Sequence, residues 1–170
     1  SGRRIPEFSK LIPKSLIKIN NKPLLKRQID LMIKCKINKI AIVKGFKSNK
    51  INFKKIKYFY NKNYKKNEQL DSLFYAKEWF NDDVLITFSD IIYENSVIKK
   101  IIKSKHNFTI GIQKNWKKKY KNRFDHPIEQ ADKVFIKNNK IKDIGKNLLE
   151  SKTNGEFIGI FKISKKMCSI

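Results

Sequence analysis

Short apolar runs alternate with segments of helical periodicity along the whole chain, and this alternation restricts the possible folds more than any other feature. The runs at 84–88, 108–112 and 156–163 are typical of buried strands. The segments at 23–35 and 95–102 place apolar residues three and four positions apart, which predicts amphipathic helices. Strands that alternate with helices favour an α/β fold with a mostly parallel sheet.

The remaining expected elements complete this pattern without any repeat or flexible linker. They are four strands and one helix, at 38–43, 56–60, 133–136, 141–144 and 71–79. Asn138-Asn139 separates the last two strands and is typical of a tight hairpin turn. Asp71 or a neighbour is expected to cap the helix that follows it. A single domain is therefore predicted over residues 1–170.

The chain is strongly basic, with a net charge of +25 from 40 Lys+Arg and 15 Asp+Glu. A nucleic-acid-binding module is one interpretation of this charge. The basic residues are nearly all lysines, spread evenly, and arginine is the residue that makes bidentate contacts with bases and phosphates. The composition therefore argues against nucleic acid as the partner, although a basic surface attracts small anionic substrates.

The sequence carries no sign of a membrane or secreted protein. No apolar run approaches the roughly 20 residues that span a bilayer, so no membrane insertion is expected. No signal peptide is visible, and Cys35 and Cys168 are expected to be reduced thiols. The chain is accordingly predicted to be cytoplasmic.

Two places have the chemistry to hold a phosphorylated ligand. The opening loop contains Gly2, Arg4 and Lys14, and a basic loop with glycine can bring backbone N–H groups and cations to a phosphate. Asp90 follows the strand at 84–88, and a carboxylate at the carboxyl end of such a strand is well placed to hold Mg²⁺. Each feature alone also fits an ordinary surface loop or a helix cap.

Together these features resemble a known family. SGRRIPEFSKLIPK resembles the sugar-nucleotide pyrophosphorylase signature G-x-G-x-R-L-x-P-L-T-x-x-x-P-K, with Glu7 in place of the usual proline. Lys36 also stands where the family usually has glycine. TFSDIIYENSVI and NGEFIGIFKIS are similar to the branch that activates phosphocholine or 2-aminoethylphosphonate with CTP. The resemblance covers nearly the whole chain.

The resemblance implies a Rossmann-like three-layer nucleotidyltransferase fold and an Mg²⁺-dependent enzyme. Such an enzyme transfers a nucleoside monophosphate, here expected to be CMP from CTP, to a small phosphorylated or phosphonate acceptor and releases pyrophosphate. A sugar-1-phosphate nucleotidyltransferase is the alternative. The family usually has an apolar strand before the glycine loop and a second metal-binding Asp near its C-terminus. The chain is therefore expected to be truncated at both ends and weakly active by itself.

The resemblance also assigns roles to individual residues. Arg4 is expected to bind the departing β- and γ-phosphates, Lys14 to stabilise charge at the α-phosphate, and Asp90 to hold Mg²⁺. The expected nucleotide-binding residues are Gly2, Arg3, Arg4, Lys14 and Ser89.

The acceptor is expected to contact Asn67, Ser72, Trp116 and Glu156. Trp116, with Tyr120, would offer an aromatic face to an ammonium group, and Glu156 would pair with its charge or support the metal. Capping for Asn67 and Ser72, and packing for Trp116, are the alternatives that the sequence leaves open.

Overall fold

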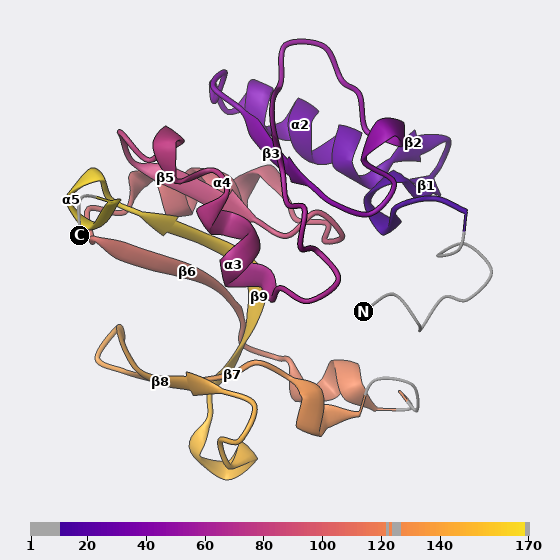
Figure 1. The fold of residues 1–170 in the computed structure, drawn as a ribbon. Coiled ribbons are helices and arrows are strands. Elements are labelled where there is room, and N and C mark those ends of the chain that lie inside the picture. Colours follow the sequence, from indigo (N-terminus) through magenta and orange to yellow (C-terminus); the bar gives the residue numbers. More distant parts are fainter. Residues whose placement is uncertain (1–10, 122, 124–126, 169–170) are drawn as a thin grey trace.

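The computed structural model describes residues 11–121, 123 and 127–168 of the chain (Figure 1). Its strands are β1 (Lys18–Ile19), β2 (Lys22–Pro23), β3 (Ala41–Lys44), β4 (Lys57–Tyr60), β5 (Val84–Thr87), β6 (Phe108–Gln113), β7 (Lys133–Lys137), β8 (Lys140–Gly145) and β9 (Gly155–Ile163). Its helices are α2 (Leu24–Lys34), α3 (Gln69–Phe74), α4 (Asn95–Lys103) and α5 (Lys165–Cys168). The short 3-10 turns that matter below are η1 (Lys14–Leu16), η3 (Lys77–Trp79) and η4 (Lys117–Tyr120).

Helix α2 begins directly after Pro23 and ends in a Schellman motif. The N–H of Ile37 donates to the carbonyl of Met32 at 2.9 Å, and the N–H of Lys36 donates to that of Ile33 at 2.9 Å. The motif places Lys36 in the left-handed region, with φ of 64°. The family that the sequence resembles usually has glycine at this position, and the backbone here favours glycine.

The helix expected at 71–79 is divided into two shorter pieces. Helix α3 begins after Glu68, whose side chain and that of Asp71 form a reciprocal capping box. Helix α3 ends at Phe74, and the chain forms η3 before it enters β5. Between β6 and β7 the chain forms the 3-10 turn η4.

Two asparagine pairs form the tight turns of two hairpins. Asn138 and Asn139, with φ of 53° and 56°, join β7 to β8, which confirms the predicted hairpin. Asn20 and Asn21, with φ of 47° and 59°, join β1 to β2 in the same way. Positive φ at both central residues matches the twist of the flanking strands, and asparagine tolerates it well.

The prediction of a mostly parallel sheet is wrong for the part of the chain that the structure describes. Strand β9 pairs antiparallel with β5, β6 and β7, and β7 pairs antiparallel with β8. Strands β5 and β6 therefore run in one direction, as their connection through α4 predicts, but β9 lies between them. Strands β3 and β4 form a separate parallel pair. Hydrophobic periodicity cannot reveal that a later strand inserts between two earlier ones.

The main core joins the two longer helices to the centre of the sheet. Ile29 of α2, Ile98 of α4 and Ile160 of β9 belong to one buried cluster, with exposed fractions of 4%, 0% and 0%. A smaller cluster of Trp116, Tyr120 and Ala131 lies apart from it. In Figure 1, α2 and β3 occupy one end of the molecule and the β7–β8 hairpin the other, with β9 running between them.

Candidate nucleotide-binding site

A four-residue turn follows β5 and carries the two candidate site residues of this region, one for the nucleotide and one for the metal. Ser89 and Asp90 occupy its exposed tip, and Phe88 and Ile91 form its two ends. The N–H of Phe88 donates to the carbonyl of Gly159 at 2.8 Å, which extends the pairing of β5 with β9 by one residue. The main chain of the sheet therefore fixes where the turn begins.

The side chain of Gln28, on α2, holds both ends of this turn. Its amide nitrogen donates to the carbonyl of Phe88 at 2.8 Å and to that of Ile91 at 2.7 Å. Gln28 is 4% exposed, and the buried residues around it on α2 are apolar. A buried amide is costly unless its polar atoms are paired, and here both amide hydrogens are used.

The carboxylate of Asp90 is exposed and has no ion pair or hydrogen bond within the described part of the chain. No group of three or more His, Cys, Asp or Glu side chains that could hold a metal ion occurs among the described residues. Mg²⁺ commonly binds one or two carboxylates together with substrate phosphates and water, so one free carboxylate fits it better than it fits an all-protein metal cage.

Lys14 begins η1, at the start of the described chain. Leu16, two residues later, packs against the same core as Ile91, so η1 and the Asp90 turn lie around one cluster. Two further cations lie near this opening segment, because the ammonium groups of Lys47 and Lys50 donate to the carbonyl of Leu11 at 3.1 and 2.9 Å. Such an arrangement concentrates positive charge where an anionic ligand is expected.

Asn61 organises the region that contains Asn67 and Ser72. It is 1% exposed, its amide donates to the hydroxyl of Ser72 at 2.9 Å, and its carbonyl oxygen accepts from the N–H of Asn63 at 2.8 Å. The hydroxyl of Ser72 in turn donates to the carbonyl of Glu68 at 3.1 Å. The N–H of Asn67 closes a turn onto the carbonyl of Asn63 at 3.0 Å. These contacts tie α3 to the end of β4.

Glu156 lies on β9 between β6 and β7, paired with Gln113 on one side and Lys133 on the other. Its half-buried carboxylate accepts a hydrogen bond from the hydroxyl of Tyr120. Burial, together with the hydrogen bond and negative charge of Glu156, raises the pKa of the Tyr120 phenol well above its ordinary value. The ring of Tyr120 meets that of Trp116 edge to face at 5.8 Å, and Trp116 is 1% exposed.

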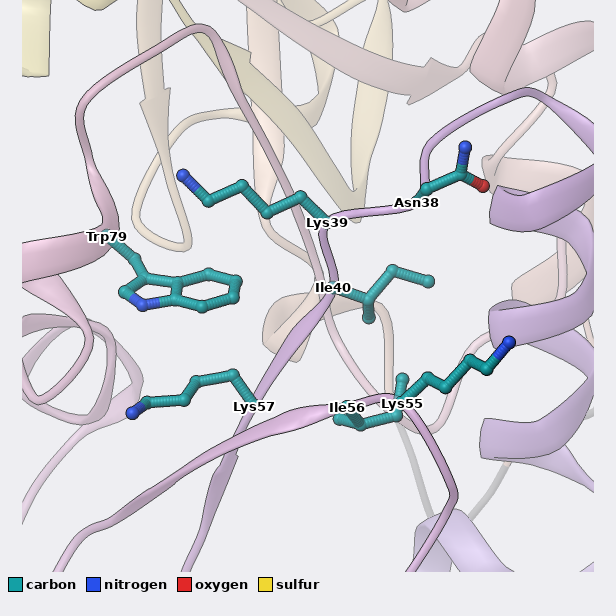
Figure 2. Close-up of a pocket in the computed structure, with 7 residues that line it drawn as sticks. All are labelled: Asn38, Lys39, Ile40, Lys55, Ile56, Lys57 and Trp79. Carbon is teal, nitrogen blue, oxygen red and sulfur yellow. The ribbon is translucent and has the colours of Figure 1, made fainter.

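A cavity of ≈ 590 Å³ lies elsewhere, at the amino ends of β3 and β4 (Figure 2). Lys39 extends over the ring of Trp79, with its ammonium 5.1 Å from the ring centroid. Ligands of open α/β sheets bind at the carboxyl ends of parallel strands, so a cavity at the amino ends of β3 and β4 is not where a ligand is expected.

Comparison with known proteins finds similarity to several nucleotidyltransferases. The chain is 28% identical over 180 residues to the CTP:phosphoglutamine cytidylyltransferase of Campylobacter jejuni, a match that covers 99% of the chain and 71% of that protein. It is 28% identical over 113 residues to the choline-phosphate cytidylyltransferase of Haemophilus influenzae, covering 64% of the chain and 48% of that protein. This chain is related to the nucleotidyltransferases.

Two further comparisons define the extent of the nucleotidyltransferase relationship. A bifunctional sugar-1-phosphate nucleotidylyltransferase/acetyltransferase of Sulfurisphaera tokodaii is 30% identical over 121 residues, which cover 71% of the chain but 30% of that protein. The solved inositol-1-phosphate CTP transferase of T. maritima superposes with a TM-score of 0.77 at 20% identity, over 99% of the chain and 68% of that structure. No protein-family model matches the chain.

The superposition confirms the Rossmann-like nucleotidyltransferase fold, while the three-layer arrangement stays a prediction. None of the helices in the described ranges is long and apolar enough to cross a membrane. Of the residues assigned to the nucleotide, Gly2, Arg3 and Arg4 lie outside the described residues. Lys14, Ser89 and Asp90 are described, and their roles stay predictions.

Sequence reasoning missed three residues that shape this candidate site. Gln28 was hidden within a helix pattern, where a polar residue is usually assigned to the solvent face. Asn61 gave no signal beyond its place after a strand. Gly159 lies within an apolar strand, and an isolated glycine there is the kind of signal that marks a bulge or a close approach.

Proposed function

We propose that this chain is the catalytic domain of a cytidylyltransferase that transfers CMP from CTP to a small phosphorylated acceptor and releases pyrophosphate. The observation that carries the proposal is the similarity to the CTP:phosphoglutamine cytidylyltransferase over 99% of the chain. Asp90, which follows β5 and is exposed and unpaired among the described residues, supports it, because nucleotidyl transfer needs a carboxylate to help hold the metal–triphosphate complex.

In the proposed reaction, a phosphate or phosphonate oxygen of the acceptor attacks the α-phosphorus of CTP in line. The new P–O bond forms as the bond from the α-phosphorus to the bridging oxygen breaks, and that oxygen leaves with pyrophosphate. The protein's task in such a reaction is to position the two substrates and to neutralise charge. Bound Mg²⁺ would neutralise charge on the triphosphate, and Asp90 would hold it.

The cations of the opening segment have separate proposed tasks. Lys14 would stabilise negative charge at the α-phosphate, and Arg4, with Arg3, would bind the β- and γ-phosphates. The backbone at Gly2 would approach the phosphates closely, and Ser89 would contact the nucleotide from the Asp90 turn. The lysines near Leu11 support this assignment by adding positive charge beside the same segment.

On the acceptor side, Glu156 is the residue that the structure supports best. Its carboxylate is half-buried and held by Tyr120, so it can pair with the ammonium of an amino-bearing acceptor without first being fixed in place. Trp116 supports Tyr120 through its edge-to-face contact, and its burial makes that contact its main contribution. Asn67 and Ser72 remain proposed acceptor contacts of lower rank, since both already make local hydrogen bonds.

A sugar-1-phosphate nucleotidyltransferase is the second candidate function. The specific observation in its favour is the 30% identity to the sugar-1-phosphate nucleotidylyltransferase/acetyltransferase over 71% of the chain. The two candidates share the nucleotide chemistry and differ in the acceptor, so the acceptor pocket distinguishes them. The cytoplasmic location also stays a prediction.

The test is Mg²⁺-dependent release of pyrophosphate, with each of the four common NTPs offered against a panel of acceptors. The panel contains phosphoglutamine, phosphocholine, 2-aminoethylphosphonate, inositol-1-phosphate and glucose-1-phosphate. Release with CTP and an acceptor other than the sugar phosphate is expected. Release with glucose-1-phosphate alone would move the assignment to the second candidate, and no release from a folded protein with any pair would refute both.

Two variants and their matched controls connect the activity to the site. Lys14→Ala and Asp90→Asn are each expected to lower kcat by about 100-fold or more, as the loss of one group that stabilises transition-state charge does. Lys137→Ala and Asp143→Asn change an exposed lysine and an exposed aspartate on the β7–β8 hairpin and should leave kcat unchanged. Equal losses in the control variants would remove Lys14 and Asp90 from the site.

A further inference from the structure

We propose that Gln28 is a positioning residue that fixes the Asp90 turn in the geometry needed to receive the metal–nucleotide complex. The inference rests on the proposed function, because it concerns the turn that carries the proposed metal ligand. Gln28 itself is too deeply buried to contact a substrate, so any effect that it has on binding must pass through the turn.

The geometry of the amide is specific to the turn. One nitrogen reaches the carbonyls of Phe88 and Ile91, which are the first and last residues of the turn, at 2.8 and 2.7 Å. Two acceptors at these distances orient the amide group, since only its nitrogen can donate to them. The single side chain thereby holds the two ends of the turn at a constant separation.

Helix α2 does not need this amide for its own packing. The other buried residues of the helix are apolar: Leu24, Leu25, Ile29 and Met32. An apolar side chain at position 28 would continue that face and avoid the cost of burying an amide. The turn is what accounts for a glutamine here, because its two carbonyls would otherwise be left without this donor.

A second set of contacts, made by β9, also holds the turn. Phe88 donates its N–H to the carbonyl of Gly159, and its ring meets that of Phe157 edge to face at 5.8 Å. Gly159 has φ of +79°, and a Cβ atom there would lie 2.7 Å from the Phe88 ring. The turn is therefore held by α2 and β9, while Ser89 and Asp90 at its tip stay exposed.

The variant that tests this idea is Gln28→Met, which keeps the length of the side chain and removes both donors. Ile29→Val is the matched control, because it alters a neighbouring buried residue of the same helix and leaves both hydrogen bonds of Gln28 to the turn in place. Should Gln28→Met fail to fold, Gln28→Asn takes its place, since it keeps an amide but moves it away from the two carbonyls.

Two measurements are made on each variant, and neither depends on turnover. Amide hydrogen exchange at Phe88, whose N–H donates to the carbonyl of Gly159, reports in the ligand-free protein how firmly the turn is held. Mn²⁺ binding in the presence of the non-hydrolysable cytidine 5′-(α,β-methylene)triphosphate, followed by electron paramagnetic resonance, reports the metal site. We expect faster exchange at the turn and about a tenfold higher Kd for Mn²⁺ in Gln28→Met, and neither change in Ile29→Val.

A third variant separates this inference from the proposed function. Asp90→Asn alone should raise the Kd for Mn²⁺ relative to wild type. The double variant Gln28→Met/Asp90→Asn should have the same Kd as Asp90→Asn alone. If Asp90→Asn has no effect on Mn²⁺ binding, the proposed function fails at its metal ligand. If Asp90→Asn weakens binding but Gln28→Met leaves both readouts unchanged, the positioning role is overturned and the proposed function stands.

Discussion

The hydroxyl of Tyr120 donates a hydrogen bond to the carboxylate of Glu156, which lies 36 positions later in the chain. The contact fastens the η4 turn to the middle of β9. It also holds the one carboxylate that we propose for the acceptor.

The first prediction concerns the pH dependence of stability. Burial and Glu156 raise the pKa of Tyr120 above the ordinary tyrosine value of 10.0. A raised pKa means that the folded state keeps the proton longer than the unfolded state does. The stabilisation is therefore complete below pH 10 and is lost progressively as the pH rises above it.

Tyr120→Phe removes this titration. Between pH 9 and pH 11 we expect the unfolding free energy to fall less steeply in Tyr120→Phe than in wild type, as measured by urea denaturation. Tyr60→Phe, at an exposed tyrosine, is the control and should keep the wild-type slope. Equal slopes in all three proteins would show that Tyr120 titrates normally.

The second prediction concerns Gly159, which combines a positive φ of 79° with the close approach of the Phe88 ring. Gly159→Ala is expected to lower the unfolding free energy by about 2 kcal/mol, because both backbone strain and a steric clash are introduced. Gly145→Ala is the matched control, since a Cβ atom there meets nothing within 4 Å. Chemical denaturation of both variants makes the comparison, and similar losses in the two would contradict it.

The third prediction decides between a structural and a binding role for Ser72. Asn61→Ala leaves the Ser72 hydroxyl and the Asn63 N–H without their buried partner, so a loss of about 2 kcal/mol in unfolding free energy is expected. Asn81→Ala, whose exposed side chain contacts Lys39, should cost far less. Ser72→Ala then separates the two roles: lower stability with an unchanged KM for the acceptor would make Ser72 a structural residue, and a raised KM would support its contact with the acceptor.

The fourth prediction is a stabilising change at the end of α2. Lys36→Gly should raise the unfolding free energy by about 1 kcal/mol, because Lys36 occupies the left-handed position of the Schellman motif. Lys34→Gly, two residues earlier and inside the helix, should lower it by about 1 kcal/mol. The opposite signs in thermal denaturation would separate the effect of the motif from a general effect of glycine.

Local signals in the sequence predicted the local structure well. The Asn138-Asn139 pair defined a hairpin because two adjacent asparagines tolerate positive φ, and the apolar faces of α2 and α4 defined two helices because their spacing is unambiguous. The Asp90 turn was placed correctly after β5 for the same reason, since the end of an apolar run marks the end of a strand.

Long-range pairing was beyond the reach of these signals. Nothing in residues 155–163 states that β9 pairs with β5 rather than with a neighbour in sequence, so the sheet was wrongly expected to be mostly parallel. Gln28 was missed for a related reason, because its two acceptors lie 60 and 63 positions away and carry no side-chain signature. Backbone carbonyls leave no trace in an amino-acid sequence.

The central place of β9 also determines when this sheet can form. Strands β5 and β6 leave the ribosome long before residues 155–163, yet each of them pairs with β9. Contacts between segments so far apart slow folding, because the intervening chain must be ordered before they form. Until β9 has been synthesised, the edges of β5 and β6 that pair with it therefore lack their partner strand. Unpaired strand edges favour aggregation, so the nascent chain is exposed to edge-to-edge aggregation during this interval.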